Sequence, residues 1–221
     1  MNFSSADRNP FPSCSRPGRP LSFTQSQNWA INEILTSIVE NKPLTVIRNP
    51  GGCGATTILD SVAKSSGIND HPAQVHYSAG PSFSSRDPAK ELAKLIGLNP
   101  RYLRQYAIAC VQSEQRLVWI VDQCSAIRLS ALRKMVGNTP GVCVIASIQF
   151  TAPTVLWQDE RTVDLQPMSL QETEAFILRK CAATGQTLAP EIAKRISIAS
   201  GGRVKTVCEL LESHCENLRA A

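Results

Sequence analysis

The stretch NPGGCGATT, residues 49–57, has the outline of a phosphate-binding loop, and it decides how the rest of the chain is interpreted. The Walker A motif, G-x-x-x-x-G-K-[ST], uses glycines so that backbone N–H groups surround phosphates, a Lys that reaches the β- and γ-phosphates, and a hydroxyl for Mg²⁺. Gly54 and Thr56 match this motif. Asn49 stands at the first glycine position, and Ala55 stands at the Lys position. Taken alone, the motif leaves open a glycine turn that binds nothing.

The composition is that of one globular domain, or of a large domain with a small one appended. The chain has 221 residues, of which 43% are hydrophobic. Its formal net charge of +5 permits an anionic partner such as double-stranded DNA without requiring one. No N-terminal signal and no apolar run of about 18 residues is evident, so we predict neither secretion nor a membrane span. Eight scattered cysteines without C-x-x-C pairs favour reduced core thiols in a cytoplasmic protein.

Outward from the loop, short apolar runs alternate with segments of helical periodicity. Because the runs are too apolar to have a solvent-exposed face, they predict a parallel sheet with helices on both sides. The runs are PLTVIR (43–48), AQVHYSAG (73–80), RLVWIVDQ (116–123) and GVCVIASIQ (141–149). The loop therefore lies between a strand and a helix, which is the context that a phosphate-binding loop requires.

The chain divides into three parts on this pattern. Residues 1–22 hold four of the 14 prolines and predict an irregular arm. Residues 23–168 predict an α/β domain of the nucleotide-binding type, whose last strand ends at Gln149. Residues 169–221 show no strand pattern and predict three helices, a small all-α lid.

A second element of nucleotide chemistry follows the loop by about 65 residues. The run LVWIVDQ resembles a Walker B strand, which would deliver Asp122 to Mg²⁺. Active enzymes usually carry Glu at the next position, where Gln123 stands. Gln forms a hydrogen bond with water but cannot take its proton. A buried strand that ends in Asp by chance is the alternative. The losses at positions 55 and 123 both predict weak or absent hydrolysis.

Two further polar positions support the same site. Ser147 or Gln149 ends the next apolar run and would lie beside a γ-phosphate, although either is also explained as an ordinary polar residue at a strand end. Lys205 follows a glycine turn near a helix start and would reach across to a phosphate, although an exposed surface Lys is the alternative. The four elements occur in the order that the site requires, which makes chance a poorer explanation for all of them together.

At this point the chain resembles the AAA+ ATPases of the ExeA secretion type and their transposition relatives of the TniB and phage Mu B type. The resemblance runs from about Asn9 to Leu211, and its most specific part is LQPMSLQETEAFI, similar to the family's L-x-P-L-x-x-x-E-x-x-x-Y-I at the start of the lid. The segments that carry it are VIRNPGGCGATTIL, RLVWIVDQ, VCVIASIQ, VDLQPMSLQETEAFILRKCAATG and ISIASGGRVKTVCELL.

The resemblance implies a P-loop NTPase fold of the AAA+ class, a parallel sheet flanked by helices with a small C-terminal all-α lid. It implies ATP or ADP with Mg²⁺ as cofactor, with the metal at Thr56 and Asp122. It assigns catalytic positions to Asp122, Gln123 and Arg161, the last as an arginine finger acting on a neighbouring subunit. Gln149 takes the place of sensor 1, and Lys205 that of sensor 2, where the family usually has Arg. The implied nucleotide-binding residues are Asn49, Gly51, Gly52, Gly54, Ala55, Thr56, Thr57, Gln149 and Lys205.

Three functions remain open at this stage. The first is an assembly or adaptor subunit with a degenerate ATP site, which self-associates and acts on a partner protein. The second is an active, divergent ATPase whose missing cation comes from Arg48, Lys205 or a neighbouring subunit. The third is a transposition-type ATPase that forms filaments on duplex DNA. The basic residues that would meet DNA phosphates are Arg101, Arg104, Arg128, Arg133 and Lys134.

Overall fold

The computed structural model describes residues 23–64, 73–78, 87–149, 157 and 159–220. The predicted arm at 1–22, and with it Cys14, lies outside these residues. The strands are β1 (Leu44–Asn49), β2 (Ala73–Ser78), β3 (Arg116–Cys124), β4 (Val142–Gln149) and β5 (Glu160–Asp164). The helices are α1 (Gln25–Val39), α2 (Ala55–Lys64), α3 (Pro88–Leu95), the 3₁₀ turn η2 (Pro100–Tyr102), α4 (Leu103–Gln112), α5 (Ala126–Asn138), α6 (Leu170–Ala183), α7 (Pro190–Ser200) and α8 (Val204–Ala220).

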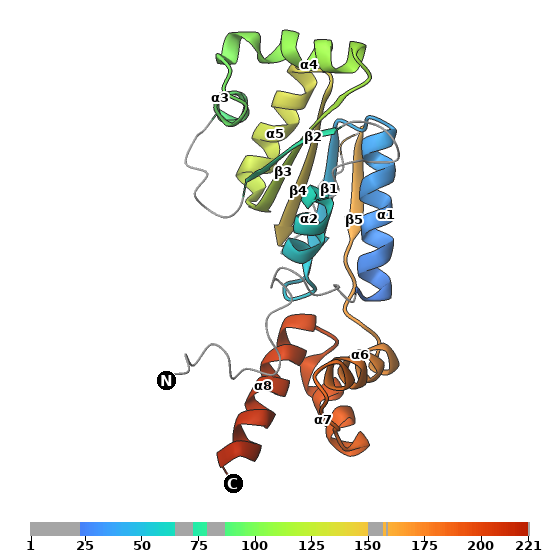
Figure 1. The fold of residues 1–221 in the computed structure, drawn as a ribbon. Helices are drawn as coiled ribbons and strands as arrows, with labels where there is room; N and C mark the ends of the chain where they lie inside the picture. Colours follow the sequence, from blue (N-terminus) through green and yellow to red (C-terminus); the bar gives the residue numbers. More distant parts are fainter. Residues whose placement is uncertain (1–22, 65–72, 79–86, 150–156, 158, 221) are drawn as a thin grey trace.

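The strands form one parallel sheet in the order β2-β3-β4-β1-β5 (Figure 1). This confirms the predicted parallel sheet. The register pairs Asn49 at the end of β1 with Gln149 at the end of β4. The carboxyl ends of β1, β3 and β4 therefore meet at one edge, which is where ligands bind in open α/β sheets.

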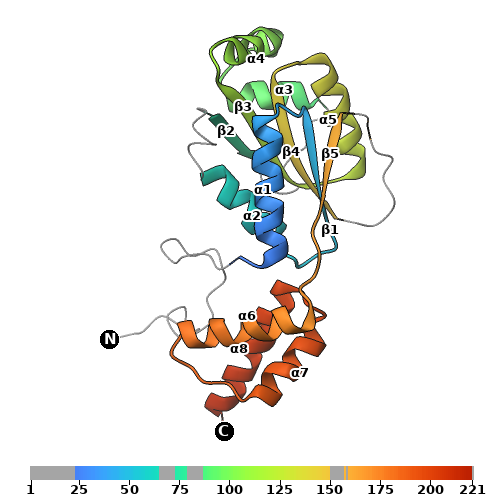
Figure 2. The ribbon, with the colours of Figure 1, turned by 90° about the vertical axis from the view of Figure 1, so that its right-hand side faces the viewer.

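Helices cover both faces of the sheet because the side chains of the central strands alternate between two cores. Val118 and Ile120 of β3 pack with α1 and α2, through residues such as Ile34 and Ile58. Trp119 on the opposite face packs with α3, α4 and α5. Figure 2 shows α1 lying along one face of the sheet beside β5. Burial of both faces explains why the central strands are almost wholly apolar.

The fifth strand corrects the prediction that the last strand ends at Gln149. β5 pairs with β1 from Glu160 to Asp164, inside the segment after Gln149 for which no strand was predicted. Its sequence, ERTVD, is short and charged, and among its residues only Val163 is buried. An edge strand has few buried side chains, so it lacks the apolar pattern by which the other strands were found.

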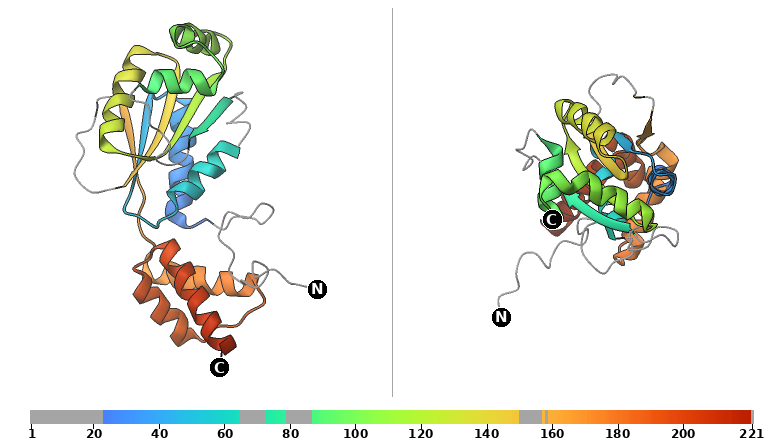
Figure 3. Two further views of the ribbon diagram at one scale, coloured as in Figure 1. Left: turned by 90° about the vertical axis from the view of Figure 1, so that its left-hand side faces the viewer. Right: turned by 90° about the horizontal axis from the view of Figure 1, so that it is seen from above.

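The C-terminal helices α6, α7 and α8 pack around a core of their own, below the sheet in Figures 1 and 3. They bear out the three helices expected after Ser169, whose hydroxyl caps α6. Within the described residues, the hydrogen bonds that connect this bundle to the rest include one from Lys205 N to Gly52 O at 3.0 Å and one from Gln25 N to a Glu172 carboxylate oxygen at 2.7 Å. The helical bundle therefore contacts both the glycine loop and the start of α1.

None of the helices within the described part of the chain combines the length and the apolar character needed to cross a membrane.

Candidate functional site

Three glycines in the loop between β1 and α2 adopt a backbone conformation that favours glycine. Gly51, Gly52 and Gly54 have φ values of 89°, 74° and 89°, which side chains with a Cβ rarely adopt. Within the described residues, no acceptor is recorded for the N–H groups of Gly54, Ala55 or Thr56. These N–H groups lie at the N-terminus of α2, where the helix dipole favours negative charge. The loop is therefore shaped for an anion even though position 55 has no cation.

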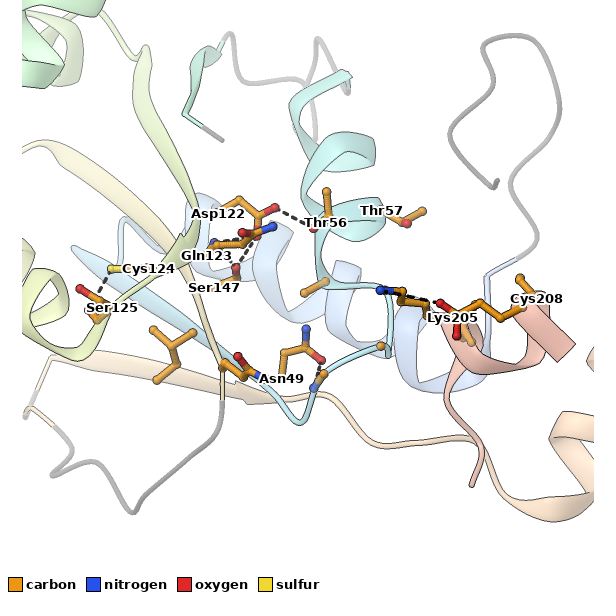
Figure 4. Close-up of a pocket in the computed structure, with 18 of the residues that line it drawn as sticks. Asn49, Thr56, Thr57, Asp122, Gln123, Cys124, Ser125, Ser147, Lys205 and Cys208 are labelled. Carbon is orange, nitrogen blue, oxygen red and sulfur yellow. Dashed lines mark hydrogen bonds and ion pairs between the residues drawn. The ribbon is translucent and has the colours of Figure 1, made fainter. Parts of the chain in front are cut away.

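Asn49 alters the first turn of this loop. Its Oδ1 accepts a hydrogen bond from Gly51 N at 3.0 Å, as Figure 4 shows. Because a glycine at position 49 would have no side chain, that N–H would otherwise be free for a ligand. The Asn49 carboxamide thus occupies one donor of the loop.

Asp122 lies opposite the loop, at the end of β3, and it is only 2% exposed. Its Oδ2 accepts from Thr56 Oγ1 at 2.7 Å and from Tyr77 Oη at 3.4 Å. Its Oδ1 accepts from the Ser147 hydroxyl and from Gln123 N at 2.9 Å. Burial, followed by the nearby Asp122 charge, raises the pKa of Tyr77, so its phenol stays protonated and can donate. Asp122 is held by neutral donors, and no cation among the described residues forms an ion pair with it.

Gln123 lies on a bulge in β3. Val121 pairs with Ala146 and Cys124 with Ile148, so one extra residue of β3 fits between these pairs. Gln123 takes the strained left-handed conformation at φ 54°, and its N–H donates to both Ser147 Oγ and Asp122. Its exposed side chain lines the same cavity as Asp122. The residue that follows Asp122 therefore reaches the cavity with an amide rather than a carboxylate.

Of the two polar residues at the end of β4, the structure connects Ser147 to the Asp122 cluster. Ser147 is buried and bonded to Asp122, whereas Gln149 is exposed and its Nε2 lies near Gly51. Both line the cavity. Sequence analysis assigned Gln149 to the sensor 1 position and left Ser147 as the alternative. The alternation of side chains along a buried strand gives both residues the same face, so the sequence does not distinguish them.

The first turns of α8 close the cavity on the side of the helical bundle. Lys205 borders it, although its side chain is 75% exposed and its Nζ lies 3.8 Å from a Glu209 carboxylate oxygen. The cavity has a volume of about 1090 Å³, at the upper end of the range for cofactor sites. Its lining carries three carboxylates, Asp122, Glu209 and Glu212, against one ammonium group, Lys205. The formal excess of two negative charges opposes a bare polyphosphate.

Two cations named from the sequence lie elsewhere. The Arg48 guanidinium is paired with the Asp164 carboxylate on β5, and this hydrogen bond raises its pKa. Arg161 is on β5, and it forms ion pairs with Glu33 of α1 at 2.6 Å and with Glu40, the C-cap of α1, at 3.0 Å. It is in register with Thr45 near the amino end of β1, away from the loop. Neither Arg lines the cavity.

The residues present fit a magnesium nucleotide better than a metal alone. Within the described residues, no group of three or more His, Cys, Asp and Glu side chains could hold a metal ion. Mg²⁺, however, usually takes one or two protein oxygens and completes its shell with phosphates and water. The Thr56–Asp122 pair supplies such oxygens directly beside the free N–H groups of the loop. These residues would hold the metal, and the loop would hold the phosphates.

Sequence analysis missed Gln27, Tyr77 and Arg203. Tyr77 comes from the edge strand β2 and reaches Asp122 only through the fold. Arg203 has its Cβ 3.5 Å from the position that a Cβ on Gly52 would occupy. Gln27 contacts the loop from α1. Gln27 fits a capping-box pattern with Thr24, which predicts a helix start but not a contact with the loop. Tyr77 and Arg203 belong to no recognisable motif.

Comparison with solved structures identifies the class of fold. The chain is similar to the Walker-type ATPase of Pyrococcus abyssi, at 13% identity and a TM-score of 0.55, covering 82% of this chain and 65% of that one. It is also similar to two RuvB variants of Thermotoga maritima. The first has 14% identity and a TM-score of 0.51, covering 88% of this chain and 64% of that one. The second has 15% identity and a TM-score of 0.50, covering 86% of this chain and 64% of that one. The chain thus spans less than two thirds of the length of these proteins.

No protein-family model and no curated protein sequence matches the chain. The identities to solved structures are low enough that the similarity establishes the fold alone. These structural similarities, together with the parallel sheet, show that the chain has the α/β fold of the P-loop NTPases of the AAA+ class.

Proposed function

We propose that this chain is an assembly or adaptor subunit that binds ADP or ATP weakly with Mg²⁺ and hydrolyses it slowly or not at all. The observation that carries this proposal is a contrast within one site. The glycine loop and the Thr56–Asp122 hydrogen bond are present, while Ala55 and Gln123 lack the groups that contact phosphate and activate water in an active site. Loss of these two side chains affects turnover more than it affects binding through the backbone.

The charge of the cavity supports weak binding that depends on the metal. Three carboxylates line the cavity, and the Lys that would offset them in an active site is absent. A divalent cation beside Asp122 would remove much of this repulsion. We therefore expect nucleotide to bind as its magnesium complex and expect the free nucleotide to bind poorly.

Self-association forms the second part of the proposal. An adaptor that no longer hydrolyses nucleotide keeps its assembly surface because association depends on shape and burial rather than on a few polar atoms. In this proposal, residues 169–221 act as the lid and head-to-tail contacts generate rings or filaments. For Arg161 to act on a neighbour, its ion pairs with Glu33 and Glu40 would have to break first. We also propose that the chain acts on a partner protein, as its resemblance to ATPases of the ExeA, TniB and Mu B types implies.

Two measurements on the purified chain test the proposal. Calorimetric titration with ADP and ATP, with and without Mg²⁺, measures binding, and phosphate release measures turnover. Light scattering over a range of concentrations, with and without ATP and DNA, measures assembly. We expect metal-dependent binding, slow or no phosphate release and a mass that rises with concentration. Rapid turnover that is lost in Asp122→Asn would instead favour the active, divergent ATPase. Of the two cations within the chain that the sequence named for this role, Arg48 and Lys205, only Lys205 lines the cavity.

A DNA-binding role is supported by a smaller set of residues than the sequence suggested. Arg101 and Arg104 are exposed at η2 and α4, and the Arg101 guanidinium lies 4.6 Å from the centroid of the exposed Tyr102 ring. Arg133 instead bonds to the Glu160 carboxylate, at 2.7 and 2.8 Å, and does not contribute to such a surface. Filter binding to duplex DNA across a salt series tests this role. A weak signal that is insensitive to salt would contradict contacts to several phosphates.

A further inference from the structure

We infer that Gln27 of α1 is a positioning residue of the phosphate-binding loop, and that it turns the Gly54 N–H toward the nucleotide. The inference rests on the proposed nucleotide function and adds a residue outside the loop motif. Gln27 does not line the cavity, and it would act only through the backbone that it holds.

Both polar atoms of the Gln27 side chain are fixed. The residue is 4% exposed, and its Oε1 accepts from Thr24 N at 3.0 Å as part of the capping box of α1. Its Nε2 donates to the carbonyl oxygen of Cys53 at 2.9 Å. Thr24 Oγ1 in turn accepts from Gln27 N at 3.1 Å. The helix start therefore determines which way the amide faces, and the amide determines the orientation of the Cys53 carbonyl.

The orientation of one peptide group follows from this contact. The described residues contain no cis peptide bond, so the Cys53 C=O and the Gly54 N–H point in opposite directions. Because the carbonyl points to Gln27, the N–H points away from α1, and Gly54 is part of the cavity lining. A Cβ on Gly54 would lie 2.3 Å from Gln27 Nε2. Glycine at position 54 thus makes room for Gln27, in addition to adopting a positive φ.

The preceding carbonyl is held from the other side. Gly52 O accepts from Lys205 N at the start of α8, at 3.0 Å. Two consecutive carbonyls at the tip of the loop are therefore bonded to different elements, one to α1 and one to α8. This arrangement fixes the loop before a ligand arrives, and donors that are already oriented cost less to organise on binding.

The missing Lys makes this orientation more important than in a loop with a complete motif. Where Ala55 stands, no ammonium group can compensate for a poorly aimed N–H. The phosphates would then depend on the backbone donors, and whatever aims those donors contributes directly to affinity. Removing one oriented donor is expected to weaken binding by about tenfold, the equivalent of one net hydrogen bond.

Three variants test the inference by calorimetric titration with Mg-ADP. Gln27→Leu removes the donor, and we expect affinity to fall by about tenfold. Gln27→Glu replaces the donor with a carboxylate oxygen, so we expect a similar loss at about pH 8. A protonated carboxyl can donate, and burial raises its pKa, so affinity should recover toward wild type at about pH 5. Thr24→Ala is the matched control because it removes the helix cap but leaves the contact between Gln27 and Cys53 intact.

The outcomes separate this inference from the function on which it rests. If the wild type binds Mg-ADP and Gln27→Leu binds it equally well, the inference is overturned and the nucleotide function stands. A loss in Thr24→Ala as large as that in Gln27→Leu, or no recovery of Gln27→Glu at low pH, would also overturn it. If the wild type binds no nucleotide, the proposed function fails. The amide spectrum of the free protein then decides: a shifted Gly54 resonance in Gln27→Leu supports the positioning role, and an unchanged one overturns it.

Discussion

Two polar clusters lie toward opposite ends of the sheet, and they treat charge in opposite ways. At the carboxyl end, the Asp122 carboxylate is surrounded by hydroxyl groups and an N–H, without an ion-pair partner among the described residues. Toward the amino end, the Arg161 guanidinium bonds to Glu33 and Glu40, and its side chain is 26% exposed. The first cluster holds a carboxylate without a counter-charge beside a cavity. In the second, a guanidinium forms ion pairs with two carboxylates of the same chain.

The difference indicates which cluster is built for a ligand. A buried carboxylate without a counter-charge is costly for the fold, and a bound cation offsets that cost. A partly exposed ion-pair cluster of the Arg161 kind stabilises the protein modestly and offers little to an incoming group. The family resemblance assigned catalytic positions in both clusters, Asp122 in the first and Arg161 in the second. The geometry supports a ligand site in the Asp122 cluster and a structural role for the Arg161 cluster.

The largest expected effect comes from Asp122. Asp122→Ala leaves Thr56, Tyr77 and Ser147 without their shared acceptor, and it should lower the free energy of unfolding by about 3 kcal/mol. Asp122→Asn retains an oxygen acceptor and removes the charge, so it should leave stability nearly unchanged while abolishing the dependence of ADP binding on Mg²⁺. Thermal denaturation and Mg²⁺ titration measure the two effects. Full Mg²⁺ dependence in Asp122→Asn would contradict a cation site at this cluster.

Restoring the missing groups should produce the next largest change. The double variant Ala55→Lys with Gln123→Glu supplies the phosphate cation and the base on the existing backbone. We expect nucleotide affinity to rise by about tenfold or more, because the new Lys adds a charge-assisted contact to phosphate that Ala55 cannot make. Calorimetry and phosphate release measure the gain, and each single variant serves as a control for the other. No change in either quantity would mean that the cavity no longer admits a nucleotide.

Arg161→Met tests the other cluster directly. Loss of two partly exposed ion pairs should lower the free energy of unfolding by about 1 kcal/mol and leave ADP affinity unchanged. A double-mutant cycle with Glu33→Gln would assign the effect to the pair. If phosphate release at high protein concentration falls in Arg161→Met, while stability does not, the residue acts on a neighbouring subunit and the contrast between the clusters fails.

The smallest expected effects lie on α8. Lys205→Met removes the ammonium group from the cavity lining, and Glu209→Gln removes a carboxylate one helical turn away. We expect Mg-ADP affinity to fall a few-fold in the first variant and to rise a few-fold in the second, since exposed charges at such distances contribute about 1 kcal/mol or less. Both changes should shrink as salt increases. Shifts in the same direction would show that charge is not the cause.

The sequence by itself determined the central sheet and the positions of the loop, Asp122 and Lys205. Apolar runs such as LVWIV can be fully buried only between two layers of helices, and glycines at 51, 52 and 54 permit the positive φ values that the loop adopts. These features depend on residues that are close together in the sequence, so the sequence alone predicts them. The edge strand β5 was missed because an edge strand needs little burial, and the ion pair of Arg161 with Glu33 was therefore not foreseen.

Only the tertiary structure decided which polar groups meet. Tyr77 and Ser147 come from different strands and converge on Asp122 because the register of the parallel sheet brings those strand positions together. Gln27 reaches the loop because α1 packs beside α2 on one face of the sheet. Hydrogen bonds between residues distant in sequence carry no periodic signal, because a single polar side chain fits many local structures. Their partners are set by packing, which the chain acquires only on folding.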